Sequence, residues 1–299
     1  MNFIKYITSL ALITLLFACQ KQENDSEFSE ITPEFEEYWY SGKAEVATYQ
    51  LNQSRYGEER KGNATLIFVT EPFSRYKQVK LDHPEKTGND KVSVMKLNFI
   101  KKFNTGIYPY SLMLSAFSPI DLAKDSSTLK VTMSGQEWCG HVFTQMNLRH
   151  NQYQVNTYSY FESEADEVFD LDKYILEDEI WNRIKINYHS LPTGKFEMIP
   201  GLFYARLLHQ PLSAQPVEAT LEPTDSTFSY RIKYKDRSLS INFNKEFPHR
   251  INSWEETFIN LKGETVSTSA TFDRMLHIDY WSKNSNKYEY LRDSLHLTF

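Results

Sequence analysis

The chain has 299 residues, with 33 Lys and Arg against 39 Asp and Glu, and a formal net charge of −6. A net acidic chain is a poor candidate for nucleic-acid binding, so we expect no nucleic-acid partner. Aromatic residues make up 15% of the sequence and favour strands, and the length suits a single β-rich domain over residues 34–299.

The first nineteen residues have the parts of an export signal in order. Met1 to Lys5 carry one positive charge, and Tyr6 to Phe17 form an uncharged run that is too short to cross a bilayer as a helix. Residues 16–19 read Leu-Phe-Ala-Cys and resemble the lipobox of bacterial lipoproteins. This resemblance implies a signal peptide over residues 1–18 and acyl chains on Cys19. The alternative is an ordinary secretory signal that ends near a Cys.

A polar segment follows Cys19. Gln20 to Asp25 are mixed in charge and resemble the short signal that sends lipoproteins of the Bacteroidota to the outer cell surface; a solvated tether is the alternative. We expect residues 19–33 to be a flexible tether. Several acyl chains hold a protein firmly on a bilayer, so we predict a lipid-anchored envelope protein of the outer membrane, with the leaflet left open.

Strand patterns dominate the first half of the remaining chain. Pro33 to Tyr40 predict a short amphipathic helix or an ordered segment before the first strand, and Pro72 is expected to end the second strand. Seven runs of alternating or continuous apolar residues predict strands: 42–53, 63–71, 92–103, 107–117, 129–133, 137–148 and 152–161.

The pattern changes after residue 161. Residues 162–179 contain nine acids and one Lys, and apolar residues then recur near helical spacing. We predict a helix over residues 170–188, with the acids on its solvated face and in its first turn, and a second short helix over 201–209. A calcium site is the alternative reading of the acids, although they lack the spacing of a calcium-binding loop.

Strands return after Pro216. Residues 228–235 and 239–243 alternate apolar with polar side chains and predict a hairpin. Strands are also expected over 250–261 and 266–281, and residues 288–299 fit either a helix or a strand. Strands that follow strands predict a mainly β fold of the β-rich α+β kind: a large antiparallel curved sheet or open barrel, with a helical insert near residues 170–209.

The clearest candidate for chemistry is the group Glu137, Cys139 and His141. On one strand these residues would share a face, but their Cβ atoms would lie roughly 6.5–7 Å apart, beyond the reach of a Cys–His pair. The alternatives are a buried thiol beside a hydrogen-bonded His and a Cys–His nucleophile or metal site. Because Cys19 is expected to be acylated, Cys139 has no partner for an internal disulfide. We predict no metal and no cofactor.

Four stretches resemble a group of Bacteroidota lipoproteins of uncharacterised function: residues 38–45, 106–111, 136–141 and 247–251. Members of the group are sometimes named septum formation inhibitor Maf. The chain lacks the Ser-x-Ser-Pro-Arg-Arg run of true Maf pyrophosphatases, so the resemblance implies no known chemistry.

These observations favour a non-enzymatic envelope lipoprotein that binds a lipid, a glycan or a partner protein on its curved sheet. The LolA and LolB carriers are the architectural analogue, and a fold analogy alone is weak support for a function. Two alternatives stay open: an envelope hydrolase or thiol enzyme that uses Cys139 and His141, and a structural component of a surface assembly. A concave face filled by side chains would count against ligand carriage.

Overall fold

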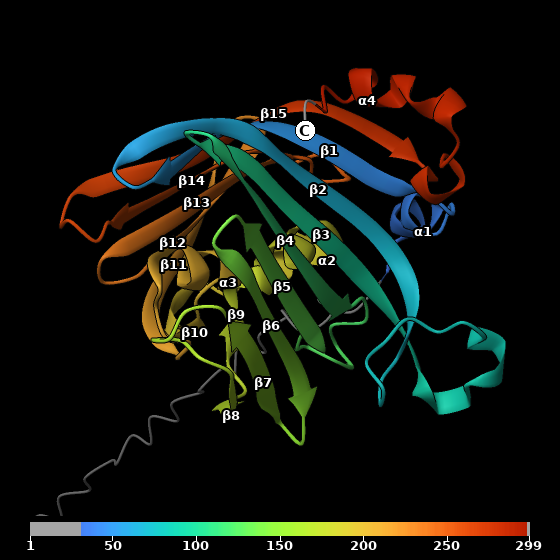
Figure 1. The fold of residues 1–299 in the computed structure, drawn as a ribbon. Helices are drawn as coiled ribbons and strands as arrows, with labels where there is room; N and C mark the ends of the chain where they lie inside the picture. Colours follow the sequence, from blue (N-terminus) through green and yellow to red (C-terminus); the bar gives the residue numbers. More distant parts are fainter. Residues whose placement is uncertain (1–30, 298–299) are drawn as a thin grey trace, which may run out of the picture.

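The computed structural model describes residues 31–297 of the chain. The predicted signal peptide, Cys19 and most of the predicted tether lie outside the described residues. Fifteen strands form one curved, unclosed sheet (Figure 1) in the order β8-β7-β6-β5-β4-β3-β2-β1-β15-β14-β13-β12-β11-β10-β9. All neighbours pair antiparallel except β9 and β10. The predicted fold class is therefore confirmed.

The strands agree closely with the predicted runs, and the structure adds short strands around the helical insert. Their bounds are β1 (Ala44–Arg55), β2 (Glu58–Ser74), β3 (Lys91–Thr105), β4 (Tyr108–Pro119), β5 (Lys130–Glu137), β6 (Gly140–Arg149), β7 (Gln152–Ser159), β8 (Glu167–Asp172), β9 (Ile175–Leu176), β10 (Gly194–Ile199), β11 (Gln215–Pro223), β12 (Thr227–Lys233), β13 (Arg237–Asn244), β14 (Ile251–Ile259) and β15 (Thr265–Ile278). The expected end of the second strand is wrong, because β2 continues past Pro72, which pairs with Ser93 of β3. The expected start of the strand over residues 137–148 is also wrong, because β5 ends at Glu137 and β6 begins at Gly140.

Four α-helices accompany the sheet: α1 (Pro33–Trp39), α2 (Ile180–Asn187), α3 (Leu202–Leu208) and α4 (Tyr290–Ser294). In α1, Pro33 is well placed in the first turn, and the Thr32 hydroxyl accepts a hydrogen bond of 3.1 Å from the Phe35 amide. This cap satisfies one of the free amides at the helix start. No helix within residues 31–297 is long and apolar enough to cross a membrane.

The predicted helical insert is present, but its first helix starts later than expected. Residues 167–172 form the edge strand β8, because Phe169 and Leu171 alternate with exposed neighbours and pair with β7. Helix α2 begins only at Ile180. The acids before it are not solvated: Glu177, Asp178 and Glu179 form a buried 3₁₀ turn. The predicted solvated position is therefore wrong for these three acids, because this turn lies inside the curved sheet. The earlier acids of the run are mostly exposed: Glu162, Asp166, Glu167, Asp170 and Asp172.

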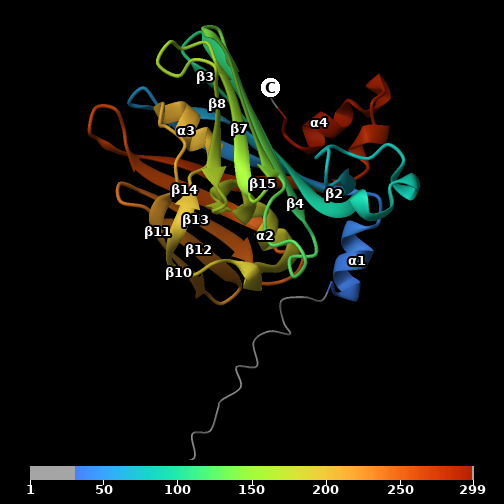
Figure 2. The same ribbon diagram turned by 90° about the horizontal axis from the view of Figure 1, so that it is seen from below.

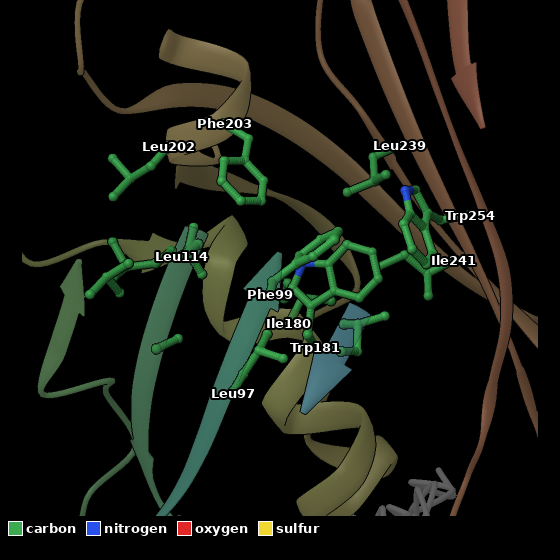
Figure 3. Packing of buried hydrophobic residues seen from close by; sticks show 14 of the residues in the cluster. Leu97, Phe99, Leu114, Ile180, Trp181, Leu202, Phe203, Leu239, Ile241 and Trp254 are labelled. Carbon is green, nitrogen blue, oxygen red and sulfur yellow. The ribbon is translucent and has the colours of Figure 1, made fainter. Parts of the chain in front are cut away.

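Helix α2 packs on the concave face of the sheet and fills its centre. The Trp181 ring centroid lies 5.2 Å from that of Phe99 and 5.3 Å from that of Trp254, and Phe203 of α3 completes the aromatic cluster (Figure 3). The Asn182 amide donates to the backbone oxygens of Met95 and Ala116, which fixes the helix against β3 and β4. The middle of the concave face is thus filled by side chains, which counts against ligand carriage there.

Successive strands alternate in direction, so the turns between them fall at two ends of the sheet. One end, which we call the α3 end, has helix α3 and the turns after β1, β3, β5, β12 and β14. Helix α1 lies at the opposite end, as both ribbon views show (Figures 1 and 2). The described chain therefore begins far from the α3 end.

Candidate functional site

The structure places Glu137, Cys139 and His141 around a tight turn and not along one strand. Strand β5 ends at Glu137 and pairs there with Gly140, so Trp138 and Cys139 make a two-residue turn. Glu137 is buried, whereas Cys139 and His141 are exposed. The expected shared face is wrong, and so is the alternative of a buried thiol. A Cβ on Gly140 would lie 2.6 Å from the Tyr160 ring, so glycine is needed where β6 begins.

The thiol in this turn has little nucleophilic character. The Glu137 carboxylate accepts a hydrogen bond of 2.7 Å from the Cys139 amide. Hydrogen bonding of the thiol to the same carboxylate raises the pKa of Cys139 above its usual value. Because the thiolate is the reactive form of cysteine, this environment does not activate the residue.

A pocket of about 410 Å³ opens at the α3 end; we call it the end pocket. Its wall consists of Tyr204, Leu207 and Leu208 of α3 with Phe258 of β14, and its polar groups come chiefly from Gln53, Arg55 and Glu256. Tyr56 and Leu261 stand at its mouth and are largely exposed. A mostly apolar lining with a few polar groups, at this volume, is typical of small-molecule sites.

Arg55 is the most unusual group of the end pocket. Its side chain points inward from the last position of β1 and the residue is only 7% exposed. The guanidinium donates to the Leu207 carbonyl and to the hydroxyls of Tyr56, at 3.2 Å, and Tyr110, at 3.4 Å. Its Nε has no hydrogen-bond partner within the described part of the chain. All three acceptors are neutral.

A buried ion cluster adjoins the end pocket. Both terminal nitrogens of the Arg237 guanidinium donate hydrogen bonds to the Glu177 carboxylate, and the bond from Nη2 to Oε1 is 2.6 Å long. The Nε of Arg237 donates to Oε1 of Glu256 at 2.6 Å. The Tyr234 hydroxyl also donates to Glu177 at 2.6 Å. The same guanidinium lies 4.2 Å from the centre of the Tyr204 ring, so the cluster supports one wall of the end pocket.

Two further ionisable groups lie in this cluster. Asp178 accepts a hydrogen bond of 3.0 Å from the Leu202 amide at the start of α3. Burial, reinforced by the negative charge of Glu177, raises the pKa of Asp178 to about 8, so this carboxyl is largely protonated at neutral pH. The Lys101 Nζ lies 5.4 Å from the centre of the Phe99 ring and 5.2 Å from that of Phe203, and burial lowers the pKa of its ammonium group.

Asp178 gives the protein a specific pH dependence. Its pKa is raised from 3.8 in the unfolded chain to about 8 in the folded one, so the folded state binds more protons between these values. The stabilising contribution is complete below pH 3.8 and is lost as the pH rises through about 8. We expect Asp178→Asn, which keeps an acceptor for Leu202, to be more stable than the wild type at pH 9 but not at pH 4.

Urea unfolding across this pH range measures the effect. Asp236→Asn, in the exposed turn after β12, is the control and should follow the wild-type profile. A constant difference between Asp178→Asn and the wild type at every pH would contradict a raised pKa for this group.

From the sequence, Glu177 and Asp178 are expected on a solvated face, and the other charged residues of this region were not singled out: Arg55, Lys101, Arg237 and Glu256. A usable signal was present: Lys101 stands between Phe99 and Phe103 at alternate positions, and Glu256 stands between Trp254 and Phe258. A charge inside an inward-facing apolar series marks a buried ionic group, because alternate residues share one face of a strand.

No group of three or more His, Cys, Asp or Glu side chains among residues 31–297 is arranged to hold a metal ion. The calcium reading of the acidic run over residues 162–179 therefore gains no support from the structure. Its last three acids are used within the protein instead: Glu177 and Glu179 form ion pairs with arginines, and Asp178 accepts from a backbone amide.

The sequence matches no protein-family model and no curated protein. Among solved structures, it is similar to the crystal structure of a beta-barrel-like protein of domain of unknown function DUF1849 from Brucella abortus. The TM-score is 0.47 at 10% sequence identity, over 79% of this chain and 98% of that chain. This degree of similarity transfers no function.

Proposed function

We propose that this protein is a non-enzymatic, lipid-anchored protein of the cell envelope that binds an apolar or amphipathic small molecule in the end pocket. The observation that carries the proposal is the pocket of about 410 Å³ with its wall of α3 side chains, next to a sheet whose centre is filled. The anchor is inferred from the lipobox-like run ending at Cys19, and the outer membrane is the proposed location.

The lining of the end pocket favours a lipid-like ligand over a glycan. Leu207, Leu208 and Phe258 offer apolar surface, and burying such surface is favourable by about 25 cal/mol per Å². The exposed side chains of Tyr56 and Leu261 at the mouth extend the apolar surface outward. A large aliphatic ligand would not fit the filled centre, so the bound part is expected to be a single chain or ring system.

The position of the end pocket suits a tethered protein. Helix α1 starts the described chain at the opposite end of the sheet (Figure 1), so a tether that leads to Cys19 would attach far from the mouth. The mouth would then be free to receive a ligand from the surrounding space or from another protein. The enzymatic alternative loses support because Cys139 is exposed in a turn and its pKa is raised.

Binding of a neutral apolar fluorophore, N-phenyl-1-naphthylamine, tests the proposal. We expect saturable binding to the wild type and a loss of roughly tenfold or more in affinity, about 1.4 kcal/mol, for Leu207→Trp, because the larger ring occupies the pocket. Val168→Trp adds the same ring at an exposed position of β8 and should bind like the wild type.

Two results would overturn the proposal: no saturable binding to the wild type, or equal affinity in the wild type and Leu207→Trp. Far-UV circular dichroism of both variants establishes that each retains the β-rich fold. Should Leu207→Trp fail to fold, Leu261→Asp at the exposed mouth replaces it, with the same expected direction.

A further inference from the structure

We propose that the ligand of the end pocket carries an anionic head group, of the carboxylate class, that pairs with Arg55, while its apolar body lies against α3. This inference rests on the proposed function and deepens it, because it names the chemistry of the ligand. The basis is a difference between Arg55 and most other buried cations of the described chain, which have a carboxylate in contact.

Most buried cations in the described residues have a carboxylate in contact. Lys185 lies 2.6 Å from Glu45, Arg183 lies 2.7 Å from Glu179, and Arg237 holds both Glu177 and Glu256. Arg55 has no ion pair with any carboxylate among residues 31–297, although it is only 7% exposed. A buried charge without a counter-ion is costly.

Lys101 is the other buried cation without an ion pair in the described chain, but its surroundings differ. The negative charges of Glu256 and Glu177 act on its ammonium group, and the rings of Phe99 and Phe203 lie within 5.4 Å of it. Lys101 is therefore partly compensated inside the protein and does not line the end pocket.

A second cation acts against the charge of Arg55 and makes its position less favourable. Arg206 of α3 is another cation, and the field of Arg55 adds to burial in lowering the pKa of Arg206. The acid closest to Arg206 is Glu164, at 3.7 Å, which also contacts His209. The Glu164 carboxylate thus contacts both Arg206 and His209, and it does not form an ion pair with Arg55.

The remaining charges of the end pocket do not neutralise Arg55 either. Glu256 lines the pocket, but its Oε1 accepts from Arg237 at 2.6 Å. At the mouth, Lys262 and Glu264 both lie beside Gly57, and Glu264 forms no ion pair with Arg55. Among the cations that line the pocket, Lys262 is exposed to solvent, whereas Arg55 is buried beside apolar walls without an ion pair among residues 31–297. An anionic amphiphile fits this combination, because its head group supplies the missing counter-ion.

Displacement of N-phenyl-1-naphthylamine by dodecanoate and by dodecanol at neutral pH tests the inference, because the two ligands differ only in the head group. For the wild type we expect dodecanoate to compete at a roughly tenfold lower concentration than dodecanol, about 1.4 kcal/mol. Arg55→Met should lose this preference and still release the fluorophore to dodecanol. Arg231→Met, at an exposed position of β12, should keep the preference.

Each outcome separates this inference from the proposed function. If the wild type does not bind the fluorophore, the proposed function fails. If it binds the fluorophore but dodecanoate and dodecanol compete equally, the pocket is real and the anionic head group is wrong. A preference that persists in Arg55→Met also overturns the role of Arg55. The wild-type comparison needs no variant, so it decides the matter even if Arg55→Met does not fold.

Discussion

Replacement of Arg237 by Met is expected to lower the free energy of unfolding by about 3–5 kcal/mol. The guanidinium is 6% exposed and neutralises both Glu177 and Glu256. Without it, two carboxylates would remain in the interior without an ion-pair partner, and the Tyr204 ring would lose the cation that lies 4.2 Å from its centre. Urea unfolding monitored by tryptophan fluorescence measures the change.

A triple variant that also neutralises both carboxylates shows whether the stability is lost through unpaired charge or through lost packing. In Arg237→Met combined with Glu177→Gln and Glu256→Gln, no buried charge is left alone, and we expect much of the stability to return. Arg231→Met, on the exposed face of the neighbouring strand β12, should stay within about 0.5 kcal/mol of the wild type. A loss below about 1 kcal/mol for Arg237→Met would show that the cluster is not stabilising.

Replacement of Cys19 by Ala is expected to abolish membrane attachment. Cys19 is the residue that the lipobox-like run places at the mature amino terminus, and acyl chains there would supply about 0.8 kcal/mol per buried methylene group. Cells supplied with a palmitate analogue should label the wild type and not Cys19→Ala, and the variant should move to the soluble fraction.

The second cysteine is the matched control for this experiment. Cys139 is exposed in the turn after β5, and Cys139→Ala should remain labelled and membrane-bound. Label on Cys19→Ala, or loss of label from Cys139→Ala, would contradict acylation of Cys19.

The strands were predictable because their signal is local. Residues 228–243 alternate apolar and polar side chains around a short polar turn, and the structure forms the hairpin β12–β13 there. The short helix α3 also lies where the sequence predicts it. A hairpin pairs residues that are close in the chain, so composition and alternation carry most of the information.

At the turn formed by Trp138 and Cys139, the alternation of side chains in the sequence predicts the wrong structure. Residues 137–148 predict one strand, but the chain reverses after Glu137. A residue outside this run also constrains the turn: Tyr160 lies so close to Gly140 that a Cβ at residue 140 would collide with its ring. Neither this contact nor the turn can be deduced from the spacing of Glu137, Cys139 and His141.

The sequence by itself determined a β-rich, antiparallel domain with a helical insert, because side-chain alternation acts between near neighbours in the chain. It also supplied the prediction of an anchor at Cys19. Only the tertiary structure decided which charges became interior. Glu177 meets Arg237 across 60 residues, and Glu45 meets Lys185 across 140. Arg55 is left without such a partner because curvature of the whole sheet, rather than any local pattern, sets which side chains face one another.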